Sequence, residues 1–529
     1  MKGGGIMEEL NKEEIKETSY VKKLVLLCLL FFKLGIVNFG GGYALLPLLN
    51  RELVDKRHWA TEQELADYYA VGQCTPGAIA VNVSTFIGYK VAGMLGGILA
   101  TLSFVMPAFI IIFIIATLLT NFSSNPFVVN ALAGINVVVF ILILSAIFKL
   151  AKKSIVDIWG IILAVTVTFL SIFVSQIPLY VYIIAAAVIG FFINLIKEKV
   201  FEKKYRVKEE AKDKEINEEA DEKIEEVKPK EKQKSVIKND VLMFIFGALT
   251  GIVIGLFGII PAIFIKNKKY RNGVIITSFF WIIIAICLIV LWITGNNTLF
   301  LIYFNFFRIG ACAFGGGLAT FPFLEELGQT TGWFTEEQLT AMLAVSESTP
   351  GAMGINMSTY VGYTVSLQAY GNNYFLAFVG STISTLGLVS PSIIVILIVS
   401  LFLQKFSKNK YVSWIFYGLR AASIGLICAA AYSVLRVSIF NVIDSSATEI
   451  VHYDLISAFT ATKDYFIANG GANFFSCIGK YVELLINWKA LAVGAIFAIL
   501  VFKFKKHPVI YIALGAIVGI LLQMGNVSL

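Results

Sequence analysis

The sequence predicts an all-α polytopic membrane protein with two homologous, inverted repeats that contain broken and re-entrant helices. Three observations carry this prediction. Of the 529 residues, 57% are hydrophobic and the mean hydropathy is +0.79, as in chains with many membrane-spanning segments. One long sequence pattern occurs twice, separated by roughly half of the chain. Both copies contain glycine triplets and proline breaks inside apolar sequence, where an unbroken helix would otherwise be expected.

The duplicated pattern sets the predicted domain boundaries. The first copy reads FFKLGIVNFGGGYALLP at 31–47 and QCTPGAIAVNVSTFIGY at 73–89. The second copy reads FFRIGACAFGGGLATFP at 306–322 and ESTPGAMGINMSTYVGY at 347–363. We predict a cytoplasmic N-terminal tail at 1–23, a first repeat at 24–196, a charged cytoplasmic linker at 197–240, connecting transmembrane segments at 241–298, and a second repeat at 299–529 with an insertion at about 437–486.

Charge and cysteine content argue against several functions. The linker holds 14 basic and 14 acidic residues, so the net charge of +8 comes from short loops between apolar segments. Basic residues in such loops mark the cytoplasmic side, which points to a lipid bilayer as partner and not to nucleic acid. The six cysteines are scattered without a CxxC pair, so we expect no metal site, no disulfide framework and no cofactor. Without an HExxH or GxSxG motif, no enzymatic activity is predicted.

Loop charges predict that the two repeats have opposite orientations. Residues 51–58 are basic, whereas their counterpart at 325–337 contains no lysine or arginine. Residues 120–127 are uncharged, whereas their counterpart at 404–410 is basic, and two further loop pairs show the same exchange. The positive-inside rule then places equivalent loops on opposite sides of the membrane. Independent drift of loop composition is the alternative.

The spacing of these charges predicts re-entrant helices. Lys23 and Arg51 both have cytoplasmic character, yet only about 27 apolar residues separate them, enough for one span or two half-spans. The glycine triplet and the Thr-Pro-Gly sequence provide the breaks. We predict two re-entrant hairpins and then four full spans in each repeat, with each break buried in protein or facing a water-filled cavity. One kinked span in place of each hairpin is the alternative.

The two Thr-Pro-Gly breaks are the predicted anion sites. Each threonine is expected to be an N-cap, with proline at the first helical position, so that a new helix begins inside the membrane. Its free N–H groups and dipole attract an anion, and the glycine lets a ligand approach the backbone. An asparagine and a threonine follow on one helix face as hydrogen-bond donors. The predicted substrate-binding residues are Thr75, Pro76, Gly77, Asn82 and Thr85 and, in the second copy, Thr349, Pro350, Gly351, Asn356 and Thr359.

Two further groups extend the predicted site. The glycine triplets form a second backbone cradle or allow close helix packing; they are Gly40, Gly41 and Gly42, and Gly315, Gly316 and Gly317. Lys33 and Arg308 occupy matching positions before the triplets and either contact an anion or extend to the membrane interface. Glu347 replaces Gln73 of the first copy and is the candidate for proton coupling, with a solvated or paired carboxylate as the alternative.

These residues resemble the chromate ion transporter family in its long two-domain form. The family signature is matched at Phe39–Pro47, Trp59 with Glu62, and Pro76–Gly88, and again at Phe314–Pro322, Trp333 with Glu336, and Pro350–Gly362. The resemblance implies a secondary active transporter that exports chromate, or a sulfate-like oxyanion, with the proton motive force. The chain departs from the family in its larger charged linker and in Ala78 and Ala352, which stand where a second proline is frequent.

The alternative functions are an anion channel, a transporter of another small anion, and a membrane scaffold or sensor. The predicted location is the cell (plasma) membrane, with many passes and a cytoplasmic linker at 197–240. Substrate identity, transport direction, coupling ion and oligomeric state, a homodimer included, are left open by the sequence.

Overall fold

The structure is a computed structural model of the whole chain. It describes residues 20–38, 46–73, 75–122, 125–174, 176–216, 275, 297–314, 316–400, 409–439, 486–504 and 506–524. Most of the predicted tail, of the connecting segments at 241–298 and of the insertion at 437–486 lies outside the described residues. We call residues 24–196 the first copy and residues 299–529 the second copy.

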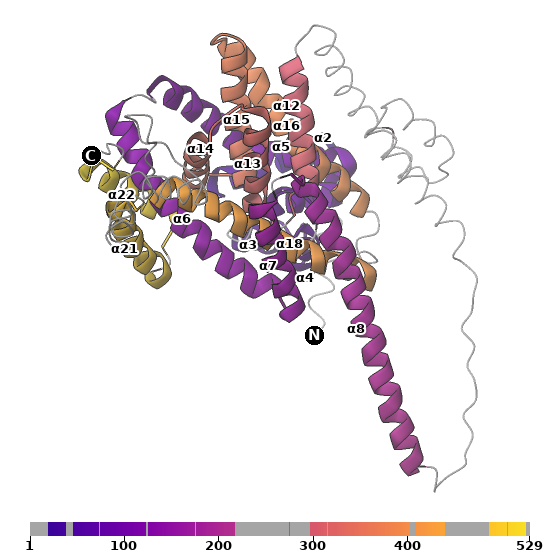
Figure 1. Cartoon of the computed structure of the whole chain (residues 1–529). Coiled ribbons are helices and arrows are strands. Elements are labelled where there is room, and N and C mark those ends of the chain that lie inside the picture. The colour runs from indigo at the N-terminus through magenta and orange to yellow at the C-terminus, as the bar shows by residue number, and fades with distance from the viewer. Residues whose placement is uncertain are drawn as a thin grey trace, which may run out of the picture.

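Every regular element among the described residues is a helix (Figure 1). The first copy contains α2 (Tyr20–Val37), α3 (Leu46–Leu49), the π-helix η1 (Asn50–Asp55), α4 (Glu62–Gly72), α5 (Ile79–Phe122), α6 (Pro126–Ser154), α7 (Ile158–Phe173) and α8 (Leu179–Ile216). The second contains α12 (Asn297–Cys312), the 3₁₀-helix η2 (Gly317–Thr320), α13 (Phe321–Thr331), α14 (Glu336–Ser348), α15 (Met353–Ala369), α16 (Tyr374–Val399), α18 (Lys410–Ile439), α21 (Trp488–Phe504) and α22 (Pro508–Leu521). Five described helices are long and apolar enough to cross a membrane, which confirms the predicted all-α membrane fold.

Equivalent sequences form equivalent helices in the two copies. α4 and α14 each begin with a capping box. The threonine side chain accepts a hydrogen bond from the backbone N–H of the N3 residue, and the N3 side chain accepts one from the backbone N–H of the threonine. α5 merges two helices across a kink at Ala92–Gly93, where the second copy has the turn between α15 and α16. α4 has 11 residues and α14 has 13, lengths of about 17–20 Å that are too short for a bilayer core of about 30 Å. These lengths favour the predicted re-entrant hairpins.

The π-helix η1 absorbs a one-residue insertion in the first copy. Pro47 and Trp59 are one residue further apart than Pro322 and Trp333 of the second copy. The backbone N–H of Lys56 donates to the carbonyl of Arg51 at 3.2 Å, an i to i+5 bond of the kind that accommodates one extra residue in a helix. The extra residue of the first copy is therefore accommodated within a helical segment.

Glycines set the same helix contacts in both copies. A Cβ added to Gly35 of α2 would lie 2.3 Å from the carbonyl oxygen of Phe104 in α5. A Cβ added to Gly310 of α12 would lie 2.2 Å from the carbonyl oxygen of Leu388 in α16. Such short distances leave room only for a hydrogen atom, so the backbones of these helices touch.

The last two helices of each copy pack against the other copy. α7 and α8 contact α18, whereas α21 and α22 contact α6, and α6 and α18 contact each other. A Cβ on Gly418 of α18 would lie 1.8 Å from the carbonyl oxygen of Ala186 in α8, so this packing between the copies also requires glycine. Beyond these contacts α8 continues to Ile216 and projects from the bundle (Figure 1), which makes the start of the charged linker helical. The exchange interlocks the two copies.

Candidate functional site

The two Thr-Pro-Gly breaks are joined to the opposite copies by reciprocal contacts. The backbone N–H of Gly77 donates to the carbonyl of Ala313 at 2.9 Å, and that of Gly351 donates to the carbonyl of Asn38 at 2.8 Å. Ala313 and Asn38 occupy the same position in the two copies, directly before the Phe-Gly-Gly-Gly sequence. Each break therefore contacts the residue that lies two positions before the other copy's glycine triplet. Reciprocal contacts are those that a twofold axis produces.

The threonine of each break bonds back to the preceding helix, and the prediction that it is an N-cap is wrong. The hydroxyl of Thr75 donates to the carbonyl of Val71 at 3.0 Å, and that of Thr349 to the carbonyl of Val345 at 2.9 Å. Thr349 is the C-cap of α14, whereas Ala352 is the N-cap of α15 and provides no side-chain hydrogen bond. The prolines and glycines instead form a short non-helical link, because the glycines have positive φ values that interrupt the helix.

A buried asparagine holds each break together. Nδ2 of Asn82 lies 3.1 Å from the carbonyl oxygen of Gly72, 3.0 Å from Oγ1 of Thr75 and 3.1 Å from the carbonyl oxygen of Pro76. Asn356 makes the three equivalent contacts at 3.2, 3.0 and 3.2 Å. Both asparagines are fully buried. In this conformation the amide N–H groups of both asparagines bond to the backbone and threonine of their own break and so stabilise its non-helical shape.

Thr85 and Thr359 connect the helix after each break to the next helix. Each hydroxyl lies within 2.9 Å of the carbonyl four residues earlier in its own helix. It also shares a hydrogen bond with a second buried threonine, Thr101 at 2.6 Å or Thr385 at 2.8 Å. These two partners, Thr101 and Thr385, were not among the residues predicted from the sequence. Their separations along the chain, 16 and 26 residues, differ because α5 is kinked where α15 and α16 are joined by a turn.

The described part of the second glycine triplet lies at the beginning of α15. Gly40, Gly41, Gly42 and Gly315 are outside the described residues. Gly316 has φ +111°, a value that favours glycine. A Cβ on Gly317 would lie 3.2 Å from the backbone nitrogen of Gly354 and 3.3 Å from that of Met353. Glycine at 317 therefore keeps space open in front of the first amides of α15, as a backbone cradle for an anion requires.

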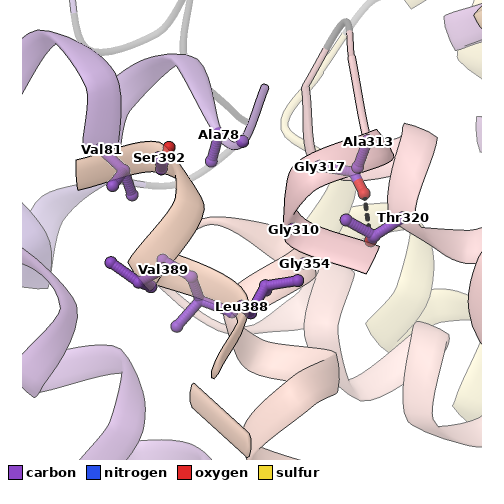
Figure 2. Close-up of a pocket in the computed structure, with 12 residues that line it drawn as sticks. Ala78, Val81, Gly310, Ala313, Gly317, Thr320, Gly354, Leu388, Val389 and Ser392 are labelled. Carbon is purple, nitrogen blue, oxygen red and sulfur yellow. Dashed lines mark hydrogen bonds between the residues drawn. The ribbon is translucent and has the colours of Figure 1, made fainter. Parts of the chain in front are cut away.

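A small pocket lies between the two copies next to the first break (Figure 2). Figure 2 shows Ala78 and Val81 of the first copy, and Gly317 and Thr320 of the second, among its lining residues. No charged side chain lines it, and its volume is about 10 Å³. A cavity needs about 10–15 Å³ to hold one water molecule, so this pocket is too small for an oxyanion. The described conformation is therefore closed at this point.

The predicted ionisable residues do not line this pocket. Lys33 is exposed on α2. Arg308 is partly buried on α12, with its guanidinium carbon 5.8 Å from the centroid of the Tyr180 ring, a cation–π contact. Glu347 is partly buried in the last turn of α14, four residues before Gly351. Among the described residues, no group of three His, Cys, Asp or Glu side chains could hold a metal ion.

The fold and the site define a class of protein. Duplicated apolar copies, half-length helices and helix breaks that contact the opposite copy are the features of a polytopic membrane transporter. The family described as Chromate transporter matches residues 25–191 and 300–520 of the chain. The chain belongs to the chromate transporter family.

Curated relatives of full and half length match the chain. A probable chromate transport protein of Synechococcus elongatus is 24% identical over 78% of this chain and 84% of its own length. The chromate transport protein of Pseudomonas aeruginosa is 23% identical over 77% of this chain and 80% of its own. The uncharacterized transporter YwrB of Bacillus subtilis is 25% identical over 32% of this chain and 87% of its own, so it corresponds to a single copy. No solved structure matches the chain.

Proposed function

We propose that the protein is a secondary active transporter that exports a tetrahedral oxyanion, chromate or a sulfate-like ion, across the cell membrane with the proton motive force. The observation that carries the proposal is the reciprocal contact of the two helix breaks with the opposite copies. A substrate held there touches both copies, so a movement of one copy relative to the other exposes it to either side of the membrane. The relatives named chromate transport protein favour chromate as the ion.

The copies have opposite orientations in this proposal. The reciprocal hydrogen bonds of Gly77 and Gly351 fit a twofold axis between the copies. Loops that are basic in one copy have counterparts without basic residues in the other, which supports an axis that lies in the membrane plane. The breaks then lie near the middle of the bilayer, and the linker at 197–240 is cytoplasmic. The closed pocket beside Gly77 fits a protein that must change conformation during transport better than it fits an open channel.

The predicted site residues take different roles in this mechanism. The helix breaks and the glycine triplets beside them form the region in which the ion binds, while the threonine hydroxyls and the Nδ2 groups of the asparagines keep the breaks in shape. Lys33 extends to the membrane interface, and Arg308 attracts the anion from its place beside Tyr180. Glu347 carries the coupled proton, since it is the one acidic residue of the Thr-Pro-Gly motifs.

Flux measurements in proteoliposomes test the proposal. Chromate and sulfate uptake is measured with and without an imposed pH gradient for the wild type and for Thr75→Ala/Thr349→Ala. The matched control is Thr382→Ala, whose hydroxyl also donates to a carbonyl four residues earlier but lies outside the breaks. We expect gradient-driven flux in the wild type and the control, and a loss of at least about tenfold in the double variant, with folding checked by gel filtration.

Two results would contradict the proposal. Anion flux that is the same with and without the imposed pH gradient in every variant would indicate a channel. The absence of flux of either anion in the wild type refutes the oxyanion assignment.

A further inference from the structure

One difference between the two breaks is a hydrogen-bond donor on the neighbouring helix. In the first break, the hydroxyl of Ser392 hydrogen-bonds with the carbonyl oxygen of Pro76, at 3.0 Å, and with Oδ1 of Asn82. Ser392 directly follows a proline in α16, and the residue that follows the matching proline in α5 is Ala108. A methyl group donates no hydrogen bond, and Oδ1 of Asn356 is accordingly buried without a partner. The first break is closed by a serine that the second break lacks.

The unpaired atom of Asn356 points into the second break. Its Nδ2 faces two carbonyl oxygens and one hydroxyl, so the amide orientation is set and the remaining atom is an acceptor. A Cβ added to Gly351 would lie 2.6 Å from this Oδ1 and 2.5 Å from the Cβ of Ala108. Gly351, with φ +121°, therefore packs closely against this acceptor and Ala108, so the second break, like the pocket beside the first, is closed in the described conformation.

Asn38, whose backbone contacts the same break, also has unpaired polar side-chain atoms. Its carbonyl accepts the N–H of Gly351, and its side chain is 1% exposed with both Oδ1 and Nδ2 lacking partners. The matching residue at the first break is Ala313, which has no polar side-chain atom. Among the described residues, three unpaired buried atoms thus lie on two residues that form or contact the second break, and none lies in the Thr75–Asn82 segment of the first. A buried polar atom without a protein partner is commonly satisfied by a bound water, an ion or a ligand, and here three such atoms occur on two residues of one break.

The set of unpaired atoms indicates the chemistry of the ligand. It consists of one donor, from Asn38, and two acceptors, from Asn38 and Asn356. A fully ionised tetrahedral oxyanion presents only acceptors and would repel both amide oxygens. An oxyanion with one proton presents one O–H group, which can donate to one of the two amide oxygens, and acceptor oxygens for Nδ2 of Asn38; its single charge is also less costly to remove from water than a double charge. The beginning of α15, whose N-cap Ala352 forms no side-chain hydrogen bond, lies next to these groups and stabilises a negative charge.

We propose that the second break, and not the first, binds the transported oxyanion, in its singly protonated form, through the side chains of Asn38 and Asn356. The proposal rests on the oxyanion transport proposed above and adds the place of the ion and its protonation state. The first break is its structural counterpart, in which Ser392 occupies the position of the ligand.

The pair Ala108→Ser and Ser392→Ala tests this assignment. Ala108→Ser supplies the second break with the donor that the first break already accommodates, so it blocks the site while it satisfies Asn356. We expect dissociation constants for chromate, measured with purified protein in detergent, to rise at least about tenfold in Ala108→Ser and in Asn38→Ala. Ser392→Ala is expected to leave chromate binding within about twofold of the wild type. Thermal unfolding shows that each variant is folded, and Ala108→Ser is expected to unfold at a higher temperature than the wild type.

The choice of probe ion tests the protonation state. Near neutral pH chromate is partly protonated, whereas selenate, which has a similar shape, remains a dianion. We expect chromate to bind and selenate to bind at least about tenfold more weakly. Equal binding of the two ions overturns the protonated form, and chromate binding that is lost in Ser392→Ala but kept in Ala108→Ser overturns the choice of break. If the wild type neither binds nor transports chromate, the proposed function itself fails, which distinguishes that outcome from a failure seen only in the variants.

Discussion

Replacing Asn82 and Asn356 by alanine should lower the free energy of unfolding by amounts that differ by one hydrogen bond. Asn82→Ala removes the two amide N–H bonds and the bond between Oδ1 and Ser392. Asn356→Ala removes only the two amide N–H bonds, because its Oδ1 has no partner. A hydrogen bond contributes about 1 kcal/mol net, so the expected losses in the free energy of unfolding are about 3 and about 2 kcal/mol. Both side chains are fully buried, so the truncation terms cancel in the comparison.

The assay is the titration of the substrate-free protein from mild detergent into sodium dodecyl sulfate, followed by circular dichroism. A double-mutant cycle gives the coupling directly: Asn82→Ala combined with Ser392→Ala should show a coupling energy of about 1 kcal/mol. Asn356→Ala combined with Ser392→Ala should show none, since the two residues belong to different breaks. Equal losses for both asparagines, together with zero coupling at Asn82, would refute the reasoning.

Three further perturbations test other parts of the structure. Gly351→Ala places a Cβ in a region of positive φ and against two side chains, and should cost at least about 3 kcal/mol, whereas Gly371→Ala, with positive φ but open space, should cost about 1 kcal/mol. Hydrogen bonds from Lys56 and Arg57 lower the pKa of Glu52 from 4.5 to about 2. Ionised Glu52 therefore stabilises the folded state fully above pH 4.5, and this contribution is lost as the pH falls toward 2. Glu52→Gln should abolish that part of the acid sensitivity of folding. Gly418→Val should separate α18 from the carbonyl of Ala186 in α8 and lower the unfolding temperature.

Each of these tests has an outcome that contradicts it. Comparable stability of the two alanine variants would mean that Gly351 is not confined by its neighbours. Acid unfolding that is unchanged in Glu52→Gln would show that this ion-pair cluster does not stabilise the fold. For the helix contact, the control is Gly494→Ala, where an added Cβ would lie 3.3 Å from one side-chain carbon of Val137. A larger loss in the control than in Gly418→Val would be inconsistent with the described packing.

Much of the candidate site was predictable because its residues repeat. The sequence predicts a helix break at Thr75 with Asn82 and another at Thr349 with Asn356. In the structure each threonine and asparagine form a hydrogen-bonded pair. Their roles within the break were not predictable. Threonine before proline is typical of an N-cap, but its hydroxyl bonds equally well to a carbonyl four residues earlier. The choice depends on where the backbone can resume a helix, and the Pro-Gly link delays that point.

Hydropathy and duplication are properties of the chain read along its length, so the sequence by itself determined that this is an all-α membrane protein with two copies of one broken-helix motif. Only the tertiary structure decided which polar groups of the two motifs remain unpaired. Ser392 satisfies an asparagine 310 residues away, and Asn38 meets Gly351 from the other copy. Hydrogen bonds act over about 3 Å in space and are indifferent to separation along the chain, so two nearly identical motifs acquire different chemistry from their neighbours.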